Sequence, residues 1–185
     1  MKRNKIYQLT TYAMMTALMC VLGPMTIPIG PIPVSLTNFV IFLSVYLLGM
    51  KGGTISYLVY LLLGAAGLPV FSGFEGGLGK MAGPTGGYLV GFIFTALISG
   101  FIMERFHAYT VVTILGMMAA MAAAYLSCTV WFVLQMQCEV WHALTTCVFP
   151  FILIDIVKIL LVTIIGKTIR GALTKAGLLA AYEKE

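Results

Sequence analysis

The chain has 185 residues, of which 61% are hydrophobic and only 9% are charged. This composition excludes a water-soluble globular domain, and the continuous apolar runs disfavour a β-barrel, whose strands alternate between apolar and polar residues. The formal net charge of +5 would suit nucleic-acid binding, but the basic residues are placed as in a membrane protein. We therefore predict an all-α integral membrane protein with no nucleic-acid partner.

Six apolar runs predict six transmembrane helices, which we expect to form one membrane-embedded domain over residues 1–185. Several runs are shorter than the roughly 20 residues that usually cross a bilayer, so some helices are expected to stop inside it or lean on protein. The runs cover residues 6–23, 36–49, 54–68, 87–103, 110–134 and 148–166.

Two segments rich in glycine and proline, residues 23–33 and 72–87, separate these runs. The second is long for a connection between helices and keeps aromatic residues among its glycines. Long loops of this kind are typical of lids and binding loops. We therefore predict Gly/Pro-rich loops over a ligand pocket.

The basic residues predict the orientation in the membrane. Nine of them fall on one side of a six-helix arrangement, and only Lys80 falls on the other. Because basic residues collect on the cytoplasmic side, we expect both termini in the cytoplasm and the Gly/Pro-rich loops outside, in a multi-pass protein of the bacterial cytoplasmic membrane. The nine residues are Lys2, Arg3, Lys5, Lys51, Arg105, Lys167, Arg170, Lys175 and Lys184.

The last apolar run contains two charged residues, Asp155 and Lys158. Each costs about 2.5–3.5 kcal/mol at the centre of a membrane helix, and residues three apart share a helix face. One interpretation is a structural ion pair. The other is a ligand site, in which Asp155 accepts from N–H donors and Lys158 binds a carboxylate. A separation of about 4.5 Å along the helix also allows both groups to bind one end of a ligand.

Tyr88 follows two glycines at the outer end of the fourth helix, where it could stack on a ligand or form a hydrogen bond with it. Ala13 and Ala17 give the first helix a face of small residues, suited either to packing within the chain or to a partner helix. The four cysteines form no CxxC pair, so no metal site is expected. Cys138 and Cys147 either pair or remain free thiols.

Catalytic and nucleotide-binding motifs are not found in the sequence. Gly166 and Lys167 resemble the end of a phosphate-binding loop, but Leu161 stands where its first glycine belongs. No nucleophile–base pair accompanies the charged residues. We expect a protein that is not an enzyme and has no cofactor of its own.

The stretch from Gly49 to Phe94 resembles the BioY family, the biotin-binding S components of energy-coupling-factor (ECF) transporters. The pieces LLLGAAGLPVF, GFEGG and GPTGGYLVGF match the family pattern in order and spacing. The early IPIGPIPVSL and Asp155-x-x-Lys158 in the last run match as well. The chain departs from the family at three positions. It has Thr37, followed by Asn38, where Gln is usual, Ile154 where a small residue usually precedes the aspartate, and Leu89 where some members have Arg.

The resemblance implies high-affinity capture of biotin by the substrate-binding subunit of an ECF-type ABC transporter. Its partners would be a transmembrane coupling subunit and two ABC ATPases that use the ATP, with membrane lipid around the chain. Ala13 and Ala17 match the small-residue face that docks on the coupling subunit. The alternatives are an S component for another vitamin and, in a different class, an intramembrane enzyme. The candidate substrate-binding residues are Asn38, Gly76, Gly77, Gly86, Gly87, Tyr88, Asp155 and Lys158.

Overall fold

In a computed structural model, residues 2–28, 32–106 and 110–175 are described. Lys184 and the predicted ends of the domain lie outside these residues. The chain is mainly helical, with one small hairpin. Its elements are α1 (Lys2–Leu22), β1 (Thr26–Ile27), β2 (Val34–Ser35), α2 (Thr37–Ala65), α3 (Leu78–Met81), α4 (Gly86–Phe106), α5 (Thr110–Met136), α6 (Val140–Cys147) and α7 (Phe149–Lys175).

A kink at Gly49 divides α2 into two helices. Gly49 has φ of 74°, a left-handed conformation that residues with a side chain rarely adopt. The helix resumes at Met50, whose backbone N–H donates to Glu104 Oε1 of α4 at 2.7 Å. The carboxylate thus satisfies a backbone donor that the kink leaves without a helical partner.

Four helical stretches in the described residues are long and apolar enough to cross a membrane: Thr37–Ala65, Gly86–Phe106, Thr110–Met136 and Val140–Lys175. With α1, and with α2 counted as two helices because of its kink, the structure fits the six predicted helices. Helices suit this environment because they satisfy their backbone hydrogen bonds internally. The prediction of a multi-pass helical membrane protein is confirmed.

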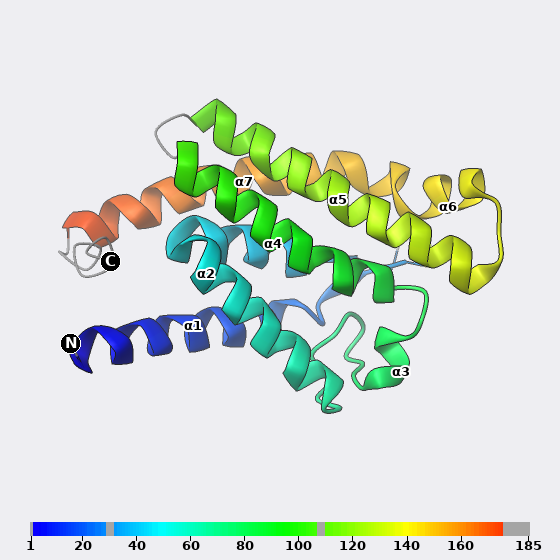
Figure 1. Ribbon diagram of the computed structural model, residues 1–185, viewed down its shortest axis with the longest axis horizontal. Helices are drawn as coiled ribbons and strands as arrows, with labels where there is room; N and C mark the ends of the chain where they lie inside the picture. Colours follow the sequence, from blue (N-terminus) through cyan, green and yellow to red (C-terminus); the bar gives the residue numbers. More distant parts are fainter. Residues whose placement is uncertain (1, 29–31, 107–109, 176–185) are drawn as a thin grey trace.

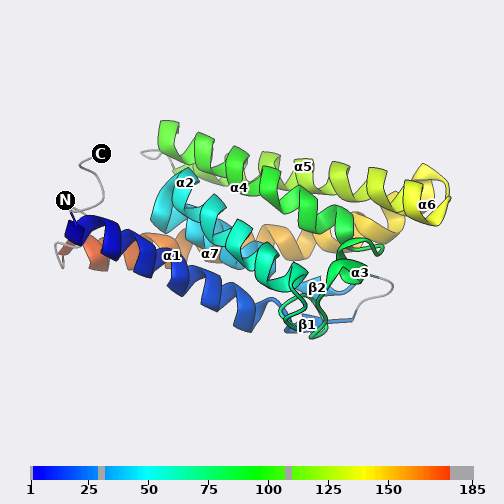
Figure 2. The ribbon, with the colours of Figure 1, turned by 60° about the horizontal axis from the view of Figure 1, so that its bottom comes forward.

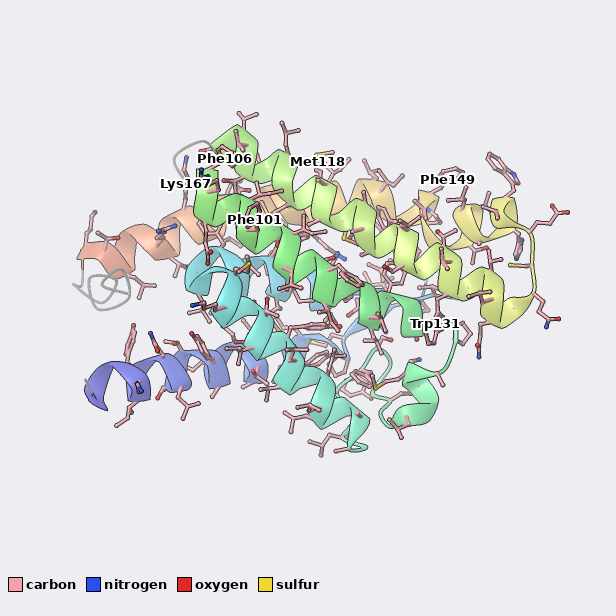
Figure 3. All side chains as sticks on the ribbon, in the orientation of Figure 1. Phe101, Phe106, Met118, Trp131, Phe149 and Lys167 are labelled. Carbon is pink, nitrogen blue, oxygen red and sulfur yellow. The ribbon has the colours of Figure 1, made fainter. Side chains whose placement is uncertain are left out.

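The start of α1 and the end of α7 lie at the same end of the bundle, whereas α3, α6 and the hairpin lie at the opposite end (Figures 1 and 2). Large apolar side chains cover the outside of the bundle, among them Phe101, Met118 and Phe149 (Figure 3). Such a surface suits a lipid environment.

Helices α4 and α5 run side by side (Figures 1 and 2), and glycines of α4 allow the close approach. A Cβ at Gly91 would lie 2.9 Å from the Ala124 Cα, and one at Gly87 would lie 2.8 Å from the Cys128 Cα. Small residues let membrane helices pack at this distance.

Two segments differ from the elements expected from the sequence. Residues 135–147, which the ends of the fifth and sixth apolar runs predict as a connecting loop, contain α6. The last helix continues to Lys175 rather than ending near residue 166, so Lys167, Arg170 and Lys175 lie in it. Apolar runs mark the part of a helix that lies in lipid, and a helix can continue beyond that part with polar residues.

Candidate ligand-binding site

A cavity opens between the hairpin, the segment after α2, and helices α2, α4, α5 and α7. It encloses about 530 Å³ of space between atoms, including its open mouth. The lining residues are Ile32, Pro33, Ser35, Thr37, Asn38, Tyr60, Ser72, Thr85, Tyr88, Leu89, Phe92, Met121, Phe151, Asp155 and Lys158.

The most buried polar part of the cavity is a cluster around Asp155, Lys158 and Asn38. The exposed fractions of these residues are 3%, 7% and 3%. Asp155 Oδ1 accepts from Lys158 Nζ at 3.1 Å and from Asn38 Nδ2 at 2.7 Å. Asp155 Oδ2 accepts from the Tyr125 hydroxyl at 2.6 Å.

Lys158 uses all three of its N–H donors within the protein. Besides Asp155, its ammonium donates to Asn38 Oδ1 at 2.9 Å and to the Ser35 carbonyl at 2.7 Å. A lysine ammonium has three donors and no acceptor, so this set is complete. The single positive charge is paired with the single negative charge, and the cluster is therefore neutral and rigidly held.

Ser35 joins the hairpin to the first turn of α2. Its Oγ donates to the Gly23 carbonyl at 2.9 Å and accepts from the Thr37 N–H at 3.1 Å. Because the Ser35 carbonyl also binds Lys158, the hairpin, α2 and α7 meet at one point of the cavity wall.

Aromatic rings form much of the remaining wall. Tyr88 packs against Phe92 and Phe151, with ring centroids 5.6 and 6.0 Å apart, and its hydroxyl donates to the Cys147 carbonyl. The tyrosine is therefore fixed at both ends, with its ring available to a ligand. A mostly apolar wall with a few placed polar groups is typical of sites for small organic molecules.

A family model for BioY matches residues 1–175. The chain belongs to the BioY family. The Biotin transporter BioY of Thermotoga maritima is 37% identical over 164 residues, covering 86% of this chain and 93% of that protein. Biotin transporter BioY2 of Lactococcus lactis subsp. cremoris is 32% identical over 178 residues, covering 94% and 96%.

A solved structure supports the same membership. The crystal structure of the S-component for biotin from an ECF-type ABC transporter matches with a TM-score of 0.86 at 30% identity, covering 92% of this chain and 94% of that chain. The family predicted from the sequence is confirmed.

The candidate residues from the sequence divide into two groups in the structure. Asn38, Tyr88, Asp155 and Lys158 line the cavity. The four glycines are absent from the described lining. A Cβ at Gly86 would meet the Met81 carbonyl, and Gly87 packs on α5, so these two place Tyr88.

Gly76 and Gly77 shape the segment that follows α2. Gly77 has φ of 86°, and its N–H donates to the Gly64 carbonyl at 2.7 Å. A Cβ at Gly76 would lie 2.2 Å from the Leu68 carbonyl oxygen. Both glycines therefore allow the segment to fold back on the end of α2.

Several site residues were not predicted from the sequence. Tyr125 lies in an apolar helix, and only the fold shows that its hydroxyl meets Asp155. Ser35 and Thr85 fall inside IPIGPIPVSL and GPTGGYLVGF, so their presence in those pieces was the available signal.

Ala13 and Ala17 lie on the exposed face of α1, whereas Thr16 and Met19 are buried. The two alanines therefore do not serve packing within the chain. The four cysteines are free thiols, so Cys138 and Cys147 are not paired.

Proposed function

We propose that this protein captures biotin and delivers it for uptake as the substrate-binding membrane subunit of an ECF-type ABC transporter. The observation that carries the proposal is the neutral, buried Asp155–Lys158–Asn38 cluster in an aromatic cavity of a BioY-family chain. Members of such a family are transporters rather than enzymes.

The cluster suits the ureido ring of biotin. That ring is neutral and polar, with two N–H donors and a carbonyl acceptor. Asp155 can accept from an N–H group, and Asn38 or Lys158 can donate to the carbonyl by exchanging one of their present bonds. The carbon skeleton would lie against Tyr88 and Phe92. Gly76, Gly77, Gly86 and Gly87 act in this proposal by shaping the backbone around the site.

The orientation proposed for the chain places both termini in the cytoplasm and the cavity toward the outside. Two observations support it. The start of α1 and the end of α7 lie together (Figures 1 and 2), and the sequence pattern assigns nine basic residues to the side that holds the termini. Residues 1–185 would then act as one domain in the bacterial cell membrane.

The partners proposed are a transmembrane coupling subunit and two ABC ATPases, which use the ATP. We propose that Ala13 and Ala17 dock on the coupling subunit, because both are exposed and small enough for close helix contact. Lipid would cover the apolar outside, and the chain itself would need no cofactor or metal ion.

Uptake of labelled biotin tests this function. Cells that lack their own biotin transporter should accumulate the label when the chain is expressed with the coupling subunit and ATPases. Excess unlabelled biotin should compete, and other vitamins should not. The control variant Asp155→Asn should take up much less. Competition by another vitamin, with none by biotin, would assign the chain to that vitamin.

A further inference from the structure

Lys158 has no free donor for a carboxylate. Its three N–H groups bind Ser35, Asn38 and Asp155 at 2.7, 2.9 and 3.1 Å. A carboxylate placed beside it would also meet the carboxylate of Asp155, since both groups share one cluster. The two negative charges would repel each other in a buried site. The cluster therefore favours a neutral group over an anionic one.

The cavity offers no other cation to the ligand's tail. Among its described lining residues, Lys158 is the sole basic residue, and Leu89 of α4 is apolar. Lys80 is the nearest basic residue along the chain to Thr85, but it is not in the lining, and its ammonium binds Glu75 Oε2 at 2.9 Å.

Among the described lining residues, one buried side-chain oxygen lacks a hydrogen-bond partner. Thr85 Oγ1 is buried, and no hydrogen bond reaches it. A buried hydroxyl without a partner costs free energy, so such an atom in a ligand cavity calls for an explanation. Thr85 directly precedes α4 and is less buried than the Asp155 cluster. The residue as a whole is therefore closer to solvent than the cluster, so a carboxylate beside it can keep part of its hydration.

We propose that Thr85 is a specificity-determining residue that donates its hydroxyl to the tail of biotin, and that this protein also accepts neutral amides of the tail. The inference rests on the proposed capture of biotin. The ureido ring occupies the Asp155 cluster, and the tail runs toward Thr85. Because a hydroxyl can bind either a carboxylate or an amide, the charge of the tail contributes little to affinity.

Calorimetry on the purified chain in detergent tests this with three ligands: biotin, biotin amide and an analogue whose tail ends in a methyl group. Biotin amide should bind within about tenfold of biotin, whereas loss of a buried ion pair would cost about thirtyfold or more. An amide that binds at least about thirtyfold more weakly than biotin would overturn the proposal. This comparison of ligands uses the wild-type protein alone.

Variants of Thr85 test the contact itself. Thr85→Val should weaken biotin by about tenfold or more, as expected for a lost hydrogen bond to a charged group. Thr85→Ser should bind like wild type. The affinity for the methyl-terminated analogue should fall by less than about twofold in Thr85→Val, because this analogue has no polar group that could accept a hydrogen bond from the hydroxyl. Equal losses of affinity for biotin and for the analogue would show that Thr85 has only a structural role and would overturn the proposal.

The matched control is Lys80→Met, which removes the nearby cation outside the lining. It should leave the ratio of biotin to biotin amide affinity unchanged. If this variant lost a preference for biotin over biotin amide, Lys80 rather than Thr85 would bind the tail. Failure of wild type to bind biotin at all would refute the proposed function, and that outcome differs from every result that refutes the role of Thr85.

Discussion

Replacement of Asp155 by Asn distinguishes an ion pair that binds the ligand from one that only stabilises the fold. The substitution keeps the size of the side chain and removes its charge. It leaves the ammonium of Lys158, a residue that is 7% exposed, without a counter-ion. It also weakens the bonds from Asn38 Nδ2 at 2.7 Å and from the Tyr125 hydroxyl at 2.6 Å.

The expected loss of stability follows from these contacts. Breaking a buried ion pair by removing one partner costs about 3–5 kcal/mol. Lys158 keeps its bonds to Ser35 and Asn38, so we expect the lower end of that range. For a chain of this size, a loss of about 3 kcal/mol lowers the melting temperature by about 6–12 °C. The double variant Asp155→Asn/Lys158→Met removes both charges and should recover most of that loss.

Binding should not recover with stability. Asp155→Asn should weaken biotin by about 2–5 kcal/mol, at least about thirtyfold, since the ureido N–H loses a charged acceptor. The double variant should stay as weak, because the acceptor is still missing. Thermal unfolding in detergent and calorimetry on the same samples measure the two effects. A double variant that binds biotin as tightly as wild type would show that the pair serves only the fold.

Three further predictions concern orientation, docking and the kink. In a background without other reactive cysteines, Gly79→Cys should react with an impermeant thiol reagent added to intact cells and Gly171→Cys should not; the reverse pattern would invert the proposed orientation. Ala13→Trp with Ala17→Trp should leave biotin binding intact and impair ATP-driven uptake, because both sites are exposed; uptake at the wild-type rate would exclude this face as the contact. Gly49→Ala should destabilise the fold by about 1–2 kcal/mol because the φ of Gly49 is 74°, whereas Gly171→Ala should not, because Gly171 lies in open space on a helix. Equal melting temperatures for the two variants would contradict the strain assigned to Gly49.

The helices could be predicted because lipid requires long apolar segments with internal hydrogen bonds. The kink was harder to locate. Residues 50–53 were expected to separate two helices, but the backbone departs from helical geometry at Gly49 alone. At the break, the Met50 N–H donates to Glu104, which lies 54 residues farther along the chain. A local pattern cannot show such a contact.

The charged part of the site could also be predicted, because charges in an apolar helix require a reason. Asp155 and Lys158 do share a face and line the cavity. Their partners depend on packing between helices distant in sequence, and Tyr125 gave no polar pattern of its own. The four glycines stay a prediction as substrate-binding residues, and the structure shows that they set backbone geometry beside the cavity.

Titration of the purified chain with biotin by calorimetry, without nucleotide or partner subunits, tests the central claim most directly. The account predicts saturable binding with one site per chain, because the cavity lies within this chain and ATP is used elsewhere. Pantothenate, riboflavin and thiamine should give no heat of binding under the same conditions. Absence of binding to biotin, together with saturable binding of one of these vitamins, would contradict the account.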